Sequence, residues 1–130
     1  MADSARQYLQ TVLRSVEAYG GRFAETPTVE VLTPEDTKAL VEAIATFPDG
    51  SRLAVSVLVD TSGSTPVWRK YRFHYMDASN ECLFRYDNAP HHLTIATFPY
   101  HRHEGPGEKV MEAGPVELLD VLEEIRRIPR

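Results

Sequence analysis

The chain has 130 residues and a net charge of −5, with 42% hydrophobic and 25% charged residues. This length suits one self-sufficient domain, so we expect a single domain over residues 1–130, and the acidic balance argues against a protein that coats nucleic acid through bulk charge. The single cysteine, Cys82, excludes an internal disulfide, and the sequence shows neither a signal peptide nor an apolar run long enough to cross a bilayer. We therefore expect a cytoplasmic protein that makes no contact with a membrane.

The first predicted element is a helix over residues 4–19. Its apolar residues recur at helical spacing, and they are Tyr8, Leu9, Val12, Leu13 and Val16. Ser4 followed by Gln7 has the spacing of a capping box. The Gly20-Gly21 pair supplies a helix stop. A short strand is expected next, over residues 28–32.

A β-hairpin is predicted from two stretches in which apolar residues alternate with other residues. These stretches cover residues 41–47 and 53–59, and Pro48-Asp49-Gly50-Ser51 between them is a strong turn. One alternative remains open for the first stretch. Thr33-Pro34 resembles a helix start, so a helix over residues 34–45 competes with the strand.

A second hairpin is predicted after a polar loop at residues 61–66. Its strands cover residues 67–76 and 81–86, where charged and aromatic side chains alternate between two faces. Asn88-Ala89-Pro90 must end the second strand, because proline offers the sheet no N–H donor.

The C-terminal third is predicted to add two short strands and a helix. The strands cover residues 93–97 and 109–111, with an exposed turn at residues 104–108, and the helix begins at Pro115. The order of elements predicts an α+β fold. We expect an antiparallel β-meander of about five to six strands, with the N-terminal and C-terminal helices packed on one face.

The histidines are concentrated in one part of the chain. All five fall between residues 74 and 103, and four lie in two runs: Arg85-Tyr86-Asp87-Asn88-Ala89-Pro90-His91-His92 and Phe98-Pro99-Tyr100-His101-Arg102-His103. Histidine changes its charge near neutral pH and is the commonest metal ligand. A reactive site is therefore expected in this region.

These two runs, together with the upstream Arg69-Lys70-Tyr71-Arg72-Phe73-His74-Tyr75, resemble the TumE-type toxin family of prokaryotic toxin–antitoxin systems. The resemblance covers roughly residues 40–125. It implies a cytosolic toxin whose partner is an antitoxin with a helix-turn-helix domain. The chain departs from the family at Leu93-Thr94, where members often continue with proline, and at Tyr100, where many members have histidine. The resemblance supplies no mechanism.

The first functional hypothesis is metal-independent, ribonuclease-like cleavage that needs no cofactor. It requires a base for the 2′-hydroxyl proton, an acid for the leaving oxygen, and cations around the phosphate. The candidate acid and base are His91 and either His101 or His103, with Asp87 orienting a histidine. The candidates for substrate binding are Arg85, Arg102, Tyr86, Asn88, His92 and His74.

Two alternatives stay open. On an extended chain, His101 and His103 point to one side, and with His91 or Asp87 they would complete a three-ligand zinc set. In a non-catalytic interaction protein, by contrast, Arg85 and Asp87 simply pair along one strand. The rings of His91 and His101 should converge in one open cleft in a nuclease, and should point apart or be buried in a binding module. RNA and a second copy of the chain, forming a homodimer, are further candidate partners.

Overall fold

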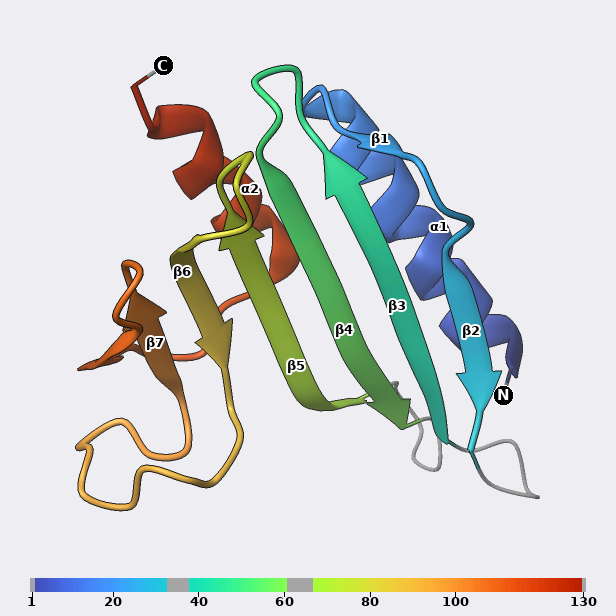
Figure 1. Cartoon of the computed structure of the whole chain (residues 1–130). Helices are drawn as coiled ribbons and strands as arrows, with labels where there is room; N and C mark the ends of the chain where they lie inside the picture. Colours follow the sequence, from blue (N-terminus) through green and yellow to red (C-terminus); the bar gives the residue numbers. More distant parts are fainter. Residues whose placement is uncertain (1, 33–37, 61–66, 130) are drawn as a thin grey trace.

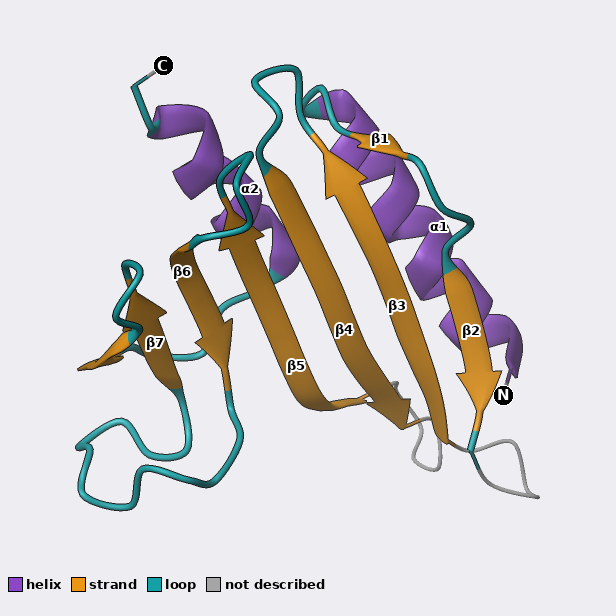
Figure 2. Ribbon diagram, in the orientation of Figure 1, coloured by secondary structure: helices purple, strands orange, loops and turns teal. Residues whose placement is uncertain are grey.

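The structure is a computed structural model, and it describes residues 2–32, 38–60 and 67–129. These residues form one antiparallel sheet of eight strands, with a helix near each end of the chain (Figure 1). Both helices lie on the same face of the sheet, and no helix formed by the described residues covers the opposite face, as Figure 2 shows. The predicted α+β class is confirmed, although the sheet has more strands than expected.

The helices are α1 (Ala2–Ala18) and α2 (Leu118–Arg127). The strands are β1 (Arg22–Phe23), β2 (Thr28–Val31), β3 (Lys38–Thr46), β4 (Arg52–Asp60), β5 (Val67–Met76), β6 (Cys82–Asp87), β7 (His101–Glu104) and β8 (Lys109–Glu112). The strand order in the sheet is β1-β3-β4-β5-β6-β7-β8, and β2 also pairs with β3. The chain from β3 to β8 is therefore a simple meander, which places β6 and β7 side by side.

The N-terminal part differs from the prediction at the start of the first helix. Helix α1 begins at Ala2, so Ser4 lies inside the first turn and is not the cap. Gly20, with a φ of 87°, follows the helix in the left-handed conformation that ends it. The alternative helix over residues 34–45 is wrong for its described part, because β3 begins at Lys38. Its expected start at residues 33–37 and the predicted loop at residues 61–66 lie outside the described residues.

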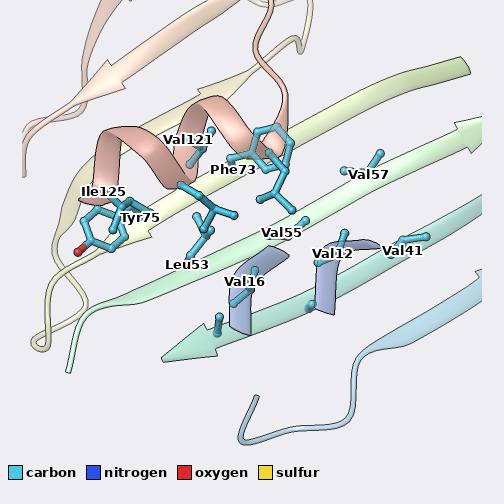
Figure 3. Packing of buried hydrophobic residues seen from close by; sticks show 14 of the residues in the cluster. Val12, Val16, Val41, Leu53, Val55, Val57, Phe73, Tyr75, Val121 and Ile125 are labelled. Carbon is cyan, nitrogen blue, oxygen red and sulfur yellow. The ribbon is translucent and has the colours of Figure 1, made fainter. Parts of the chain in front are cut away.

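Alternation of apolar residues builds the core between the sheet and the two helices. Figure 3 shows side chains from α1, α2 and the central strands packed together: Val12, Val16, Val41, Leu53, Val55, Val57, Phe73, Tyr75, Val121 and Ile125. Each is at most 2% exposed. Burial of one such side chain contributes about 1.5–3 kcal/mol. The core therefore fixes which face of β3, β4 and β5 points away from the helices.

The segment that precedes β7 is a loop and not the predicted strand. Residues 88–100 make turns, with backbone bonds such as Phe98 N–H to the Ile95 carbonyl at 3.0 Å. Leu93 is 74% exposed, so the apolar residues of this segment do not belong to a strand packed on the core. Strand β7, which the sequence did not predict, begins directly after the loop. The expected edge strand near residue 109 is confirmed as β8.

The C-terminal helix begins later than expected. It starts at Leu118 and not at Pro115, and Glu117 is its N-cap. The backbone N–H of Glu117 donates to the Asp120 carboxylate at 2.8 Å, which completes a capping box. No helix in the described ranges is long and apolar enough to cross a membrane.

Candidate functional site on the open face of the sheet

The face of the sheet opposite the helices carries two rows of polar side chains across β5, β6 and β7. The strand register aligns Arg72, Asp87 and His101 in one row, and His74, Arg85 and His103 in the next. Successive residues of a strand point to opposite faces, so residues two apart share a face. The buried ring of Phe73 pairs with Tyr86 on the inner face. Both polar rows therefore lie on the outer face.

Asp87 is the centre of this array. It is 6% exposed, and both carboxylate oxygens have partners. Oδ1 accepts a bond from the backbone N–H of Ala89 at 3.1 Å and lies 2.7 Å from Nε2 of His101. Oδ2 accepts from Nε of Arg85 at 3.1 Å, as expected for residues two apart on one strand. The other end of Arg85 donates to the Glu108 carboxylate at 2.7 Å, so two acidic groups hold this guanidinium.

His101 has partners on both ring nitrogens. Its Nδ1 lies 2.9 Å from the Pro99 carbonyl oxygen, which can only accept, so Nδ1 carries a proton and donates it. The 2.7 Å contact between its Nε2 and Asp87 then requires one further proton shared by the two side chains. At 3% exposure, the ring is held in place by this pair of bonds and is shielded from solvent.

His103 differs from His101 in having one nitrogen without a partner. Its Nδ1 lies 3.3 Å from the Glu108 carbonyl oxygen and donates to it. Its Nε2 is buried and forms no hydrogen bond with any residue that the structure describes, since the nearest Asp87 oxygen is 3.8 Å away. Burial lowers the pKa of His103, and the charge of Arg85 lowers it further. The neutral ring then presents the lone pair of Nε2 to its surroundings.

A third imidazole, that of His92, reaches back from the loop over these two rings. Its ring centroid lies 4.8 Å from that of His101 and 5.5 Å from that of His103, and the last two are 5.0 Å apart. Each ring offers one nitrogen that could bind a metal, and these three nitrogens lie within 4.8 Å of one another. Among the described residues, this trio is the set that could hold a metal ion.

The polar rows and the loop after β6 enclose a pocket of about 630 Å³. Its charged lining comprises Lys70, Arg72, Arg85 and Asp87, which gives +2 before any histidine is protonated. The lining also includes His91, His92, His101 and His103. His91 and His101 thus share one pocket, as the nuclease hypothesis requires, but only His91 is exposed. A positive pocket on a chain of net charge −5 suits an anionic ligand.

Two predicted substrate-binding residues lie on the other face of the sheet. The Tyr86 hydroxyl donates to Glu124 of α2 at 2.6 Å, and Arg102 donates to the same carboxylate and to the Tyr86 hydroxyl, each at 2.5 Å. The guanidinium of Arg102 also stacks over the Phe84 ring, 4.6 Å from its centroid. These contacts join α2 to β6 and β7 and direct both side chains away from the pocket.

The remaining predicted residues lie near the pocket. Asn88 lines it and accepts a bond from the backbone N–H of Tyr71 at 3.0 Å, which fixes the first residue of the loop. His74 is on the outer face but lines a neighbouring hollow of about 340 Å³. Burial lowers its pKa, and the nearby charge of Arg85 lowers it further.

Sequence reasoning missed three charged residues of the site. Lys70 and Arg72 share a strand face with His74, and that alternation was a usable signal for placing them beside the cluster. Glu108 comes from the turn before β8, with a φ of 50°, and meets Arg85 only because β7 and β8 fold back along β6. No local pattern in the sequence indicates that contact.

Comparison with known proteins identifies the family. A family model described as "Toxin TumE" matches residues 9–129, which is nearly the whole chain and more than the roughly 40–125 expected from the motifs. Searches of curated proteins and of solved structures returned no match. Toxins of this kind are components of toxin–antitoxin modules, which implies an antitoxin partner. The chain belongs to the TumE toxin family.

Proposed function

We propose that this toxin acts on RNA and that the outer-face pocket is the place where it acts. The observation that carries the proposal is the pocket itself. It gathers imidazole, guanidinium, ammonium and carboxylate groups from β5, β6, β7 and the loop between the last two. Those groups are the ones needed to bind a phosphodiester and transfer protons near neutral pH. The rest of the chain carries a net negative charge, so the positive charge of the pocket favours binding of an anionic substrate there.

Lys70 and Arg72 are the groups suited to first contact with a phosphate. Both are exposed and line the pocket, and neither forms an ion pair with another residue in the described ranges. Arg85 is different, because Asp87 and Glu108 already neutralise it. Its role in the proposal is to hold the Asp87 carboxylate in position.

His91 is the group best placed to exchange a proton with a substrate. It is exposed and lines the pocket, whereas both nitrogens of His101 are occupied by Pro99 and Asp87. In the proposed reaction His91 removes the 2′-hydroxyl proton, O2′ attacks phosphorus, and the bond from phosphorus to O5′ breaks. The departing O5′ takes a proton from solvent water, the proton held by His91 neutralises the hydroxide that this leaves, and a 2′,3′-cyclic phosphate remains.

The inner group, formed by Asp87, His92, His101 and His103, lines the pocket next to the proposed phosphate site, and Lys70 and Arg72 supply the positive charge in this proposal. Metal-free acid–base catalysis by His91 with either His101 or His103 was the expectation from sequence. The bonds to His101 favour a positioning role for that ring instead, with Asp87 as its anchor.

The partner is proposed from the resemblance alone. We infer that the antitoxin carries a helix-turn-helix domain and that the pair acts in the cytoplasm. A binding module of the same fold is the competing function, and the Arg85–Asp87 pair and the burial of His101 are the observations in its favour.

The test is cleavage of a defined RNA by the purified toxin and by its His91→Ala variant. Matched substrates carry 2′-deoxy substitutions at the cleaved positions. The proposal predicts cleavage of the RNA, resistance of the deoxy substrate, and a loss of about 100-fold or more in the variant. Glu17→Gln, which changes an exposed carboxylate on α1, on the opposite face of the sheet, is the control and should cleave normally. Equal cleavage of both substrates, or full activity of His91→Ala, would contradict the mechanism.

A further inference from the structure

We propose that His92, His101 and His103 form a binding site for one divalent transition-metal ion, with zinc the ion that suits it best and Asp87 beside it. The inference concerns binding and stands on the geometry of the rings. Only its consequence for catalysis rests on the function proposed above.

The two buried rings are oriented as metal ligands are. Nδ1 of His101 donates to the Pro99 carbonyl, and Nδ1 of His103 donates to the Glu108 carbonyl. A histidine that binds metal through one nitrogen usually donates the other N–H to a backbone carbonyl or a carboxylate, which fixes the tautomer. Nε2 is therefore the nitrogen that each ring would offer to a metal. In His101 this atom lies 2.7 Å from Asp87, so metal binding must displace the proton that the two side chains share.

The Nε2 atom of His103 provides a second and independent observation. The residue is 7% exposed, and this atom has no hydrogen-bond partner among the residues that the structure describes. A buried polar atom left without a partner is destabilising, because its lost hydration is not replaced by another bond. Coordination of a cation by the lone pair removes that destabilisation, and the neighbouring Nδ1–H bond already sets the tautomer that exposes the lone pair.

The spacing of the donor atoms fits one ion after a small movement. Two ligand atoms on a tetrahedral zinc lie about 3.4 Å apart, as follows from Zn–N bonds of about 2.1 Å. One nitrogen from each of the three rings already lies within 4.8 Å of the others. His92 is on the irregular loop at residues 88–100, so it can approach the two fixed rings by side-chain rotation.

The charge balance also favours a transition metal over magnesium or calcium. Three imidazoles with a single carboxylate suit zinc and its neighbours, whereas the harder ions prefer sets of oxygen ligands. Asp87 supplies the negative charge beside the rings. The nearest guanidinium, that of Arg85, is offset by Asp87 and Glu108, which reduces its repulsion of a cation.

The site would give the pocket its electrophile. A bound zinc ion acts as a Lewis acid that polarises a phosphoryl oxygen. His91 is the neighbour of His92 in the chain and lines the same pocket, while Lys70 and Arg72 lie on β5 along another part of the wall. The arrangement separates proton transfer by His91 from charge stabilisation at the inner trio.

The test uses the untagged full-length toxin, stripped with a chelator and titrated with zinc against a chromophoric competitor. The proposal predicts about one zinc ion per chain. His92→Ala should weaken binding by at least about tenfold, because it removes a ligand. His91→Ala, which changes the adjacent histidine, and His74→Ala, which changes a histidine outside the trio, should leave affinity unchanged. His103→Gln is a second ligand variant, which keeps the test decisive if one variant folds poorly.

Several outcomes overturn the site. They are the absence of zinc binding by the wild-type chain, binding retained by His92→Ala and His103→Gln, or equal loss in His91→Ala. The failures of the two proposals are distinguishable. Zinc binding by a protein that cleaves no RNA would contradict only the proposed function. RNA cleavage by a protein that binds no zinc would contradict only the metal site.

Discussion

Oδ1 of Asp87 lies 2.7 Å from Nε2 of His101, and this contact joins the last residue of β6 to the first residue of β7. The loop of residues 88–100 begins directly after Asp87 and ends directly before His101. The pair therefore closes the loop at its base and fixes the inner wall of the pocket. Most of the site's organisation depends on the Asp87 carboxylate, because Arg85 and the Ala89 backbone also bond to it.

Asp87→Asn should destabilise the protein and weaken the site. The amide keeps the shape but removes the charge that Arg85 and His101 share, and loss of a buried charge partner costs about 3–5 kcal/mol. Urea unfolding measures the loss, and Glu17→Gln, which changes an exposed carboxylate on α1, should change stability by less than about 0.5 kcal/mol. A variant as stable as the wild type would show that Asp87 does not anchor the loop.

Tyr86→Phe should lower stability without affecting the pocket. It removes the hydroxyl that donates to Glu124 at 2.6 Å and accepts from Arg102, at a cost of about 1–3 kcal/mol. Because these contacts lie on the helix face, zinc affinity and RNA cleavage per folded molecule should equal the wild-type values. A selective loss of cleavage with unchanged stability would contradict this and would indicate that Tyr86 binds substrate, as expected from the sequence.

Two leucines on α2 allow the effect of burial on stability to be measured separately from the effect of helix propensity. Leu122 is 0% exposed, and Leu122→Ala should cost about 2–5 kcal/mol through lost burial and the cavity that remains. Leu119 is 54% exposed on the same helix, and Leu119→Ala should cost less than about 0.5 kcal/mol. Thermal or urea unfolding of both variants gives the comparison. Similar losses would mean that α2 does not pack on the sheet through the Leu122 face.

The stability of the metal-free protein should fall as the pH is lowered, in part because of His74. Burial and Arg85 lower the folded-state pKa of His74 below the usual value of 6.5, so the unfolded chain binds the proton more readily. The resulting stability is present above the unfolded pKa and is lost as the pH falls through the folded one. His74→Gln should therefore flatten the decline in unfolding free energy between about pH 7 and about pH 5. Parallel curves for the two proteins would contradict this assignment.

The sequence predicted most of the sheet because side-chain alternation is a strong signal wherever one face packs on a core. The hairpins of β3–β4 and β5–β6 follow from it, and so does the shared side of His101 and His103. The same alternation points Arg102 away from both histidines and Tyr86 toward the core. Their inner-face position was therefore predictable, although they were expected to bind substrate.

The loop before β7 could not be predicted by that signal. Its apolar residues, such as Leu93 and Ile95, indicated a strand, but β6, the strand before the loop, already pairs with β5 on one side and β7 on the other. The approach of His92 to His101 depends on the turns within this loop. Sequence spacing favoured His91 or Asp87 as the third ligand, since it contains no information on how the loop returns.

The most direct measurement of the central claim is growth arrest on induction of the toxin in cells that lack its antitoxin. Wild-type, His91→Ala and Glu17→Gln chains are compared at equal soluble amounts. If the outer-face pocket is where the toxin works, the wild type and Glu17→Gln arrest growth and His91→Ala does not. Full toxicity of His91→Ala at the same soluble amount would contradict the account.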